Sequence, residues 1–329
     1  MGLPRVFVTR KISQDALSRL TQYTDLAVWE GLFPPPRAQL ELEVKRCDGL
    51  LTMITDVIDA HLLENPSNLK VISNMATGLD NIDIETATSK GILIGSTPGV
   101  LAKTCAELTF AILLAAARRI VEGDHFVHDG SWQTWHPGQM LGLDLYNRTL
   151  GVVGLGSIGS EVASRAVGFE MDVVYYQRER RRDLETRFGL RFAETLDELL
   201  KQSDYVSLHV PLTRETYHMI GKNQLNTMRS NAILVNTTRG AVVDQQALVK
   251  ALQNQTIRGA ALDVMEEEPI NPGDPILNLE NVVLTPHIGS ASEGTRRKME
   301  IIAVENLLNG LQGKPMPNCV NPDAVDNRE

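Results

Sequence analysis

The sequence is poor in the features that mark membrane, disulfide-rich or metal-binding proteins. No apolar run in its 329 residues reaches the roughly 18 residues that a membrane-crossing helix needs, so no membrane partner is expected. The apolar stretch at the N-terminus is too short for a secretory signal, and Val6 replaces the serine or threonine of a myristoylation motif. The three cysteines, Cys47, Cys105 and Cys319, form no C-x-x-C pair, which argues against a disulfide framework and a zinc ribbon. These absences predict a cytoplasmic protein with reduced thiols and no metal site.

Acidic residues outnumber basic ones overall, yet positive charge is concentrated in one short stretch. The formal net charge is −9, with 43% hydrophobic and 22% charged residues, a composition that is ordinary for a globular protein and argues against a nucleic-acid partner. Residues 177–182 nevertheless read "QRERRR". Four arginines in six positions indicate a local function for positive charge in this acidic protein. A solvated loop is the alternative.

Strand-like apolar runs alternate with amphipathic helical segments along the chain. The first series contains "RVFVTR", "DGLLTMI", "VISNMA" and "GILIGST", with Ser13 as a helix cap and a helix expected over 59–70. A long helix is expected over 102–130, and a second series of strands begins at "RTLGVVGLG". Such alternation predicts an α/β fold with two doubly wound, parallel-sheet, Rossmann-like domains. We expect a substrate-binding domain at 1–99 and 290–329, into which a dinucleotide-binding domain at 100–289 is inserted.

A glycine-rich motif opens the second series. Gly154, Gly156 and Gly159 form G-x-G-x-x-G directly after the strand-like "LGVV" and at the start of a helical pattern. In this context the first glycine permits a tight turn, the second lets backbone approach a pyrophosphate, and the third lets helix and strand pack closely. We expect the N–H groups near Ser157 and Ile158 to bind the anion. A glycine-rich turn without a ligand is the alternative.

The arginine-rich stretch occupies the position where an NAD-binding domain usually carries an acidic residue. That residue lies about 20 positions after the motif and binds the ribose 2′-hydroxyl; here Gln177 stands at the end of the second strand, followed by Arg178. Replacing the carboxylate removes its repulsion of a 2′-phosphate, and an arginine supplies a charge-assisted donor. Asp172 and Glu179 are rival acids. We therefore expect NADP(H) as the preferred cofactor, with NAD(H) as the alternative.

Three further segments carry residues suited to hydride transfer to a 2-oxo acid. "NTTRG", "EEEP" and "TPHIGS" contain Arg239, Glu268 and His287, each after a strand-like run. The carboxyl ends of parallel strands converge on the ligand crevice. An arginine there binds the carboxylate, a histidine delivers a proton, and a carboxylate orients the histidine. Spacing alone does not separate Glu268 from Glu266 and Glu267.

Taken together, these segments resemble the D-2-hydroxyacid dehydrogenase family over essentially the whole chain. The resemblance rests on "MATGLDNIDI", "TPGVLAKTCAELTFAILLAAARR", "VVGLGSIG", "VSLHVPLTRETYHMI", "LVNTTRGAVVDQQAL", "GAALDVMEEEP" and "NVVLTPHIGSAS". It implies that Arg239 binds the substrate carboxylate and carbonyl, that Glu268 is the glutamate before Pro269, and that His287 is the acid and base. It also implies cofactor contacts, in addition to the glycine motif and Arg178, at Thr104, Val210, Pro211, Thr216, Thr237, Thr238, Asp263 and Gly289.

Within the family, the chain looks most similar to the glyoxylate/hydroxypyruvate reductase branch. The resemblance implies substrate contacts at Met53, Thr77, Gly78, Ser290 and Trp135. The implied activity is NADPH-dependent reduction of glyoxylate or hydroxypyruvate; a reductase of larger 2-keto sugar acids and a corepressor-like scaffold that senses dinucleotides are the alternatives. Thr77 stands where phosphonate dehydrogenases of the family carry lysine and argues against that activity. A homodimer built on residues 100–148 is expected, with Trp135 reaching the neighbour's active site.

Overall fold

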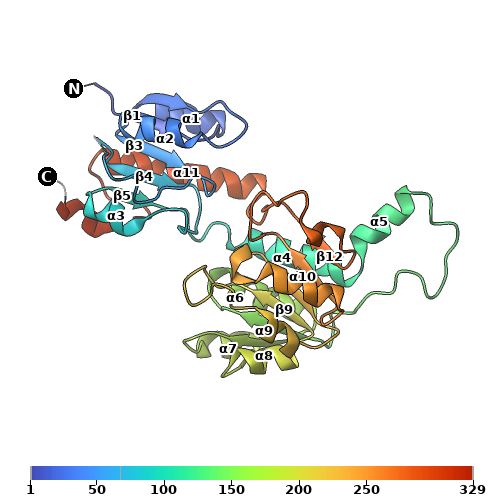
Figure 1. The fold of residues 1–329 in the computed structure, drawn as a ribbon. Coiled ribbons are helices and arrows are strands. Elements are labelled where there is room, and N and C mark those ends of the chain that lie inside the picture. The colour runs from blue at the N-terminus through green and yellow to red at the C-terminus, as the bar shows by residue number, and fades with distance from the viewer. Residues whose placement is uncertain (1, 67, 328–329) are drawn as a thin grey trace. The chain divides into compact units, whose positions relative to one another are not determined.

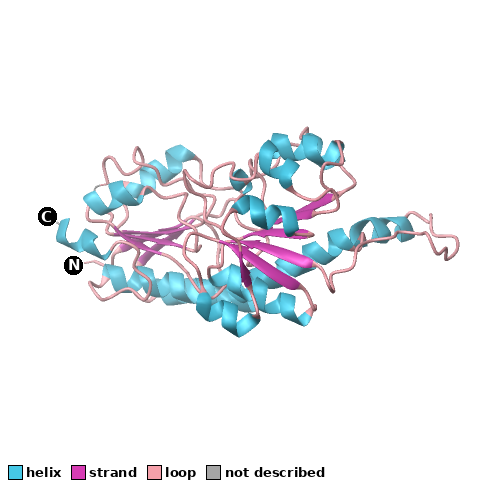
Figure 2. Ribbon diagram, turned by 90° about the horizontal axis from the view of Figure 1, so that it is seen from below, coloured by secondary structure: helices cyan, strands magenta, loops and turns pink. Residues whose placement is uncertain are grey.

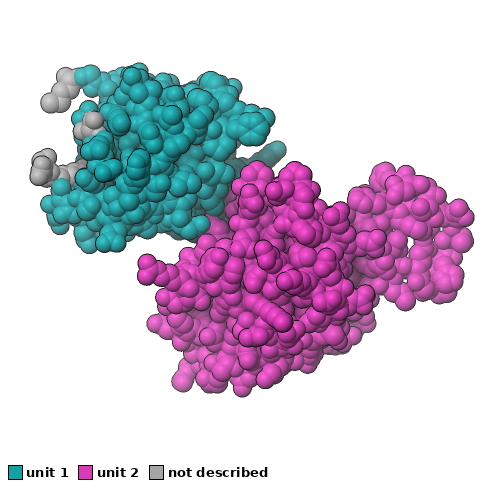
Figure 3. Space-filling model, in the orientation of Figure 1, with its two compact units in different colours: residues 1–101, 292–329 teal, residues 102–291 magenta. Residues whose placement is uncertain are grey.

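The chain forms two compact units. The computed structural model describes residues 2–66 and 68–327, and it divides the chain into unit 1, residues 1–101 with 292–329, and unit 2, residues 102–291 (Figure 3). Both junctions lie two residues beyond the ones expected from the sequence. Unit 2 is therefore a continuous insertion between the two parts of unit 1.

Unit 1 is built on a five-stranded parallel sheet in the order β2-β1-β3-β4-β5; β1, β3, β4 and β5 are labelled in Figure 1. The strands β3 and β4 are buried along their whole length, which is typical of parallel sheets covered on both faces. Helix α1 begins where expected, because the Ser13 hydroxyl accepts a hydrogen bond from the Ala16 N–H. The elements are β1 (Arg5–Val8), α1 (Gln14–Thr21), β2 (Asp25–Val28), α2 (Arg37–Val44), β3 (Gly49–Thr52), β4 (Val71–Asn74), α3 (Ile84–Ser89), β5 (Leu93–Gly95), α11 (Glu293–Leu311) and η3 (Pro322–Asn327).

Unit 2 is built on a seven-stranded parallel sheet in the order β12-β11-β10-β9-β6-β7-β8. The strand order reverses between β6 and β9, so this is the place where a doubly wound sheet binds its ligand. Figure 2 shows helices on both sides of each sheet, and the predicted fold class is confirmed. The elements are α4 (Ala102–Ala117), α5 (Ile120–His128), β6 (Thr149–Val153), α6 (Ser157–Gly168), β7 (Asp172–Tyr176), α7 (Arg182–Phe188), β8 (Arg191–Phe192), α8 (Leu196–Gln202), β9 (Tyr205–Leu208), α9 (Lys222–Thr227), β10 (Ile233–Asn236), η1 (Gly240–Val242), α10 (Gln245–Gln253), β11 (Gly259–Leu262), η2 (Pro275–Asn278) and β12 (Val282–Leu284).

The expectation of one helix over 102–130 is wrong, because the helix breaks after Ala117. Arg119 has a φ of 55°, which a continuing α-helix does not allow. The Ala117 carbonyl accepts a hydrogen bond from the Leu143 N–H, 2.7 Å away, so the returning chain satisfies the end of α4. Helix α4 packs in the core of unit 2, whereas α5 has no buried residue and projects from the unit with the segment that follows it (Figure 1).

The helix expected over 59–70 is also absent from the described residues of that segment. Residues 59–66 and 68–70 form turns and irregular structure, and Ser67 lies outside the described residues. Pro66 disfavours helical backbone at Asn65, which explains why a helix does not extend through this segment. Across the described part of the chain, no helix combines the length and the apolarity that a membrane crossing requires.

Candidate active site

The glycine motif forms the turn between β6 and α6. Gly154 has a φ of 92°, and a side chain at Gly159 would come within 2.1 Å of the Gly154 carbonyl oxygen. These two positions therefore require glycine, the first for its backbone conformation and the second for the close packing of helix on strand. Nothing lies within 4 Å of the place where a side chain of Gly156 would stand. The turn thus leaves open space over the start of a twelve-residue helix.

This open helix start is suited to a dinucleotide pyrophosphate. The first N–H groups of a helix have no carbonyl partner within it, and they attract anions together with the helix dipole. Ser157 at this end is exposed and Ile158 is half-buried. His209, which follows β9 and packs beside Gly159, adds no positive charge, because burial lowers the pKa of His209 to about 3. The residues of unit 2 fit a nicotinamide dinucleotide at this edge.

Gln177 lies beside the glycine turn, where the sequence predicts it, but its side chain is bonded to the protein. Its Oε1 accepts a hydrogen bond from the Leu155 N–H at 2.9 Å, and its Nε2 donates to the Glu179 carbonyl oxygen. The Gln177 amide therefore ties the end of β7 to the middle of the glycine turn. A sequence pattern could place the residue but not this contact, which joins two neighbouring strands.

The arginines that follow Gln177 differ in their contacts. Arg180 pairs with Glu185 at 2.8 Å, and Arg181 pairs with Asp183 at 2.9 Å. The hydrogen bond from Arg180 lowers the pKa of Glu185. Arg178 is exposed and has no ion pair within residues 2–66 and 68–327. Of these three arginines, Arg178 is the one available to an anionic ligand.

The predicted cofactor contacts beyond β9 lie at the same edge of the sheet. The Val210 side chain lies 2.9 Å from the position that a Cβ atom at Gly154 would occupy. The segment after β9 therefore borders the glycine turn. Within that segment the Thr216 hydroxyl donates to the Pro211 carbonyl oxygen at 2.6 Å. Thr216 therefore holds the loop in shape.

Helix α4 carries the predicted cofactor residue Thr104 and two further residues, Cys105 and Thr109, that lie near other predicted cofactor residues. Thr104 lies in its first turn and is half-buried. The Cys105 sulfur lies 3.3 Å from the position that a Cβ atom at Gly289 would occupy. The hydroxyl groups of Thr109 and Thr237 lie 3.1 Å apart. The start of α4 is thus adjacent to the segments that follow β10 and β12.

Arg239 follows β10 in a turn that the fold holds tightly. Asn236, at the end of β10, donates from its amide to the Arg239 carbonyl oxygen at 2.8 Å and accepts from the Thr238 hydroxyl at 2.8 Å. A side chain at Gly240 would come within 1.8 Å of the Met265 backbone. The absence of a side chain at Gly240 therefore brings the Arg239 turn against the segment that leads to Glu268.

Glu268 and His287 form a dyad. The Glu268 Oε2 lies 2.6 Å from the His287 Nδ1, and the Glu268 Oε1 accepts from the Met265 N–H at 3.0 Å. A carboxylate at Nδ1 assigns the proton of neutral imidazole to that nitrogen and leaves Nε2 as the atom that exchanges a proton. No partner of the His287 Nε2 is found among the described residues. Glu268 follows β11, which neighbours the strand that precedes Arg239, and His287 follows β12, which lies on the other side of β11.

The structure also distinguishes Glu266 from Glu268. Glu266 lies 2.7 Å from the His218 Nε2 and accepts from the Gln245 N–H, so it belongs to a second histidine–carboxylate pair. Neither His218 nor this pair was predicted from the sequence. No local pattern could have revealed it, because the two residues lie on different loops 48 positions apart.

Asp263 organises the turn that carries His287. Its carboxylate accepts hydrogen bonds from the Thr285 hydroxyl at 2.6 Å, the Ile288 N–H at 2.8 Å and the Gly289 N–H at 2.8 Å. The side chain is 1% exposed, so these bonds compensate for the burial of a charge. Asp263 therefore orients the His287 turn, and Ser290 follows it as a half-buried residue.

The remaining predicted substrate residues lie in unit 1 and in the arm of unit 2. Met53 follows β3, and Thr77 and Gly78 follow β4. The Thr77 hydroxyl donates to the Thr97 carbonyl oxygen at 3.0 Å, whereas the N–H groups of Thr77 and Gly78 have no partner in the part of the chain that the structure describes. Trp135, in the segment after α5, is 76% exposed.

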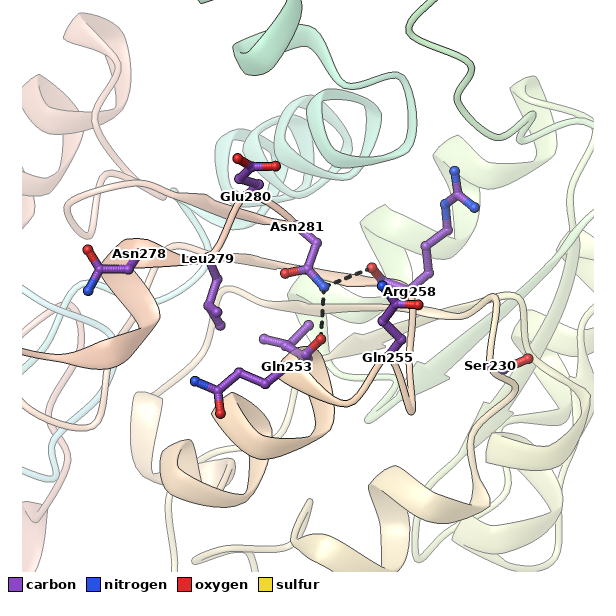
Figure 4. A pocket seen from close by; sticks show the side chains of 9 residues that line it. Ser230, Gln253, Gln255, Arg258, Asn278, Leu279, Glu280 and Asn281 are labelled. Atoms are coloured by element: carbon purple, nitrogen blue, oxygen red, sulfur yellow. Dashed lines mark hydrogen bonds between the residues drawn. The ribbon is translucent and has the colours of Figure 1, made fainter. Parts of the chain in front are cut away.

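An open depression of about 630 Å³ lies at the other edge of the unit 2 sheet. Arg258 and Asn281 border it and precede β11 and β12, so it faces the amino ends of the strands (Figure 4). The Asn281 side chain donates to the carbonyl oxygens of Leu252 and Arg258. This depression is separate from the candidate site, because ligands of doubly wound sheets bind at the carboxyl ends. No metal-binding cluster of three or more His, Cys, Asp or Glu residues occurs within 2–66 and 68–327.

Comparison with known proteins relates this arrangement to one family. Residues 110–289 match the model of the D-isomer specific 2-hydroxyacid dehydrogenase NAD-binding domain. A glyoxylate reductase of Korarchaeum cryptofilum is 51% identical over 323 residues, which cover 98% of this chain and 97% of the relative. The TT0316 protein of Thermus thermophilus superimposes with a TM-score of 0.90 at 47% identity, covering 96% of this chain and 99% of the other. An NADPH-dependent glyoxylate/hydroxypyruvate reductase of Sinorhizobium meliloti, solved with NADP and malonate, has a TM-score of 0.86 at 29% identity, covering 100% and 99%.

Proposed function

The chain belongs to the D-isomer specific 2-hydroxyacid dehydrogenase family, and on that premise we propose that it is an NADPH-preferring reductase of glyoxylate and hydroxypyruvate. Family membership supports the more general assignment, an NAD(P)-dependent dehydrogenase that acts on small 2-oxo acids. The Glu268–His287 dyad at the carboxyl edge of the unit 2 sheet is the observation that best supports the reaction. Glycolate and D-glycerate are the corresponding products.

The proposed chemistry assigns one role to each residue of the trio. When bound, the reduced nicotinamide supplies the hydride that adds to the carbonyl carbon of the substrate. Arg239 binds the substrate carboxylate through its guanidinium fork and polarises the carbonyl. Protonated His287 donates its Nε2 proton to the developing alkoxide oxygen. Glu268 holds the Nδ1–H and stabilises the positive charge that the imidazole carries before this transfer.

The preference for NADPH rests on the segment after β7. Arg178 has no ion pair among the described residues and acts on Glu215 only at longer range, so it can bind a 2′-phosphate without breaking an ion pair. Gln177 is uncharged and lies next to the turn that would hold the pyrophosphate. A carboxylate in its place would repel the phosphate and favour NADH.

Steady-state kinetics with a substrate panel test this proposal. Glyoxylate, hydroxypyruvate, pyruvate and a larger 2-keto sugar acid are each reduced with NADPH and with NADH, and kcat/KM is compared. We expect glyoxylate or hydroxypyruvate with NADPH to give the largest value. A larger value for the sugar acid would overturn the substrate assignment, and equal values with the two cofactors would overturn the cofactor assignment.

A homodimer built on α5 and the segment up to residue 148 completes the proposal. Val127, Trp132 and Leu141 on this arm are more than half exposed, and α5 buries none of its residues. Apolar side chains that cover nothing in their own subunit are typical of an interface. A second copy of the chain is the occupant that we propose, with Trp135 contributing to the neighbour's substrate site.

A further inference from the structure

Buried polar side chains support the two segments of unit 1 that carry the predicted substrate residues. They stand at the ends of three neighbouring strands or just beyond them, and none is more than 2% exposed. The group consists of Thr9 after β1, Thr52 at the end of β3, Asp56 in the following turn, and Asn74 at the end of β4. Polar groups at such depth need hydrogen bonds, so the contacts among them constrain the local backbone.

Asn81 connects both segments to this group. Its Nδ2 donates to the Met53 carbonyl oxygen at 3.1 Å and to the Asp56 carbonyl oxygen at 2.9 Å. Its Oδ1 accepts from the Asn74 Nδ2 at 3.1 Å, and the same Asn74 nitrogen donates to the Gly78 carbonyl oxygen at 3.3 Å. The amides of Asn81 and Asn74 together therefore link the segment of Met53 with the segment of Gly78.

The same contacts determine which polar groups stay available. The Met53 N–H donates to the Asp56 carboxylate at 2.7 Å, so Met53 is held through both its N–H and its carbonyl. The Gly78 carbonyl is bound to Asn74, and the Thr77 hydroxyl is bound to the Thr97 carbonyl oxygen. The N–H groups of Thr77 and Gly78 have no acceptor among the described residues. These are the donors expected to receive a substrate carboxylate.

We propose that Asn81 is a positioning residue for the 2-oxo acid substrate. It holds the Met53 segment and the Thr77–Gly78 segment in fixed positions relative to each other. This inference rests on the proposed function. Two adjacent N–H groups bind a carboxylate well only when their peptide planes are held, and preorganised donors avoid the entropy cost of ordering at binding. Asn81 does not touch the substrate; it acts through the backbone of the residues that do.

Asn81→Asp is the decisive variant. It keeps the size of the side chain but replaces the Nδ2 donor with an oxygen that faces two carbonyl oxygens. We expect the KM for glyoxylate to rise about 10-fold or more, since two hydrogen bonds are lost and the Asp56 carbonyl oxygen is left unpaired, while the Met53 carbonyl oxygen keeps only its bond from the Asp56 N–H. The factor by which kcat falls should be smaller than the factor by which KM rises, because the variant weakens binding of the substrate in the ground state and the transition state alike. The dissociation constant of NADPH should stay within about twofold of the wild-type value. Asn81→Ser, which adds no charge and keeps one donor, should give an intermediate KM.

Asn321→Asp is the matched control. Asn321 lies in the same unit, donates twice through Nδ2 to the Thr88 hydroxyl and the Ile92 carbonyl oxygen, and accepts once from the Ile94 N–H. It holds neither predicted substrate segment. A general loss of stability would affect both asparagine variants, whereas a positioning role predicts a raised KM in the Asn81 variants alone.

Hydrogen–deuterium exchange gives a readout that does not depend on turnover. Peptides covering residues 50–58 and 74–83 should exchange faster in both Asn81 variants and at the wild-type rate in Asn321→Asp. Unchanged exchange in these peptides, or an unchanged KM in folded Asn81→Ser, overturns the inference while the proposed function stands. If the wild-type protein turns over none of the 2-oxo acids, the proposed function is overturned instead. The exchange rates alone then decide whether Asn81 holds the two segments together.

Discussion

Replacing Arg178 with alanine tests whether the segment after β7 selects the cofactor. Arg178 is exposed and has no ion pair in the described part of the chain, so Arg178→Ala breaks no close contact of the free protein and removes only the longer-range effect of its charge on Glu215. The change in cofactor affinity then reports directly the lost bond to the 2′-phosphate. A hydrogen bond to a charged group contributes about 1.5–3 kcal/mol, which corresponds to roughly 10- to 100-fold in NADPH affinity.

The assay is fluorescence titration of NADPH and NADH with the wild-type protein and three variants. Arg178→Ala should weaken NADPH binding by the stated factor and leave NADH within about twofold. Arg181→Ala is the matched control, because Arg181 is already paired with Asp183; it should change neither affinity. The preference of the wild type should also decline as salt is raised from about 0.05 to 0.5 M, because the Debye length shortens.

Gln177→Glu completes the comparison by adding a charge without changing the size of the side chain. An oxygen remains to accept from the Leu155 N–H, so the glycine turn keeps its contact. The new carboxylate should weaken NADPH binding by repulsion and give NADH a partner for its 2′-hydroxyl. If Arg178→Ala weakened both cofactors equally, the arginines would be a solvated loop and the assignment of NADP(H) would be wrong.

Three further predictions concern catalysis and assembly. His287→Ala should lower kcat/KM about 100-fold or more while NADPH titration stays near normal, since general acid catalysis contributes about 10²–10⁴; near-full activity would contradict the role. Arg239→Lys should raise the KM for glyoxylate and lower kcat, because a point charge does not replace a bidentate fork; unchanged constants would exclude it as the carboxylate ligand. The protein should elute in light-scattering chromatography with the mass of two chains at micromolar concentration, and Trp132→Asp with Trp135→Asp should shift it toward the monomer; a monomeric wild type would refute the dimer.

The parts of the fold that local sequence determines were predictable. The glycine turn of unit 2 and the cap of α1 at Ser13 each depend on a few consecutive residues. The break between α4 and α5 depends instead on the returning chain, because the Leu143 N–H binds the last carbonyl of α4. Strand β2 (Asp25–Val28) was not predicted either; it lies at the edge of the sheet and is only half-buried, so its apolar signal is weak.

The three successive glutamates show most clearly where reasoning from spacing ends. In the sequence Glu266, Glu267 and Glu268 are chemically equal, and spacing alone offered no reason to choose among them. In the fold Glu266 lies beside His218, and Glu268 lies beside His287. The two pairs differ in where the histidine lies and in which of its ring nitrogens faces the glutamate. His287 follows the strand next to β11 and leaves Nε2 without a partner among the described residues, whereas the Nε2 of His218 is the atom that binds its glutamate. A histidine bound through Nδ1 keeps its outer nitrogen available for proton transfer, so the geometry supports the dyad of Glu268 and His287 as the catalytic one.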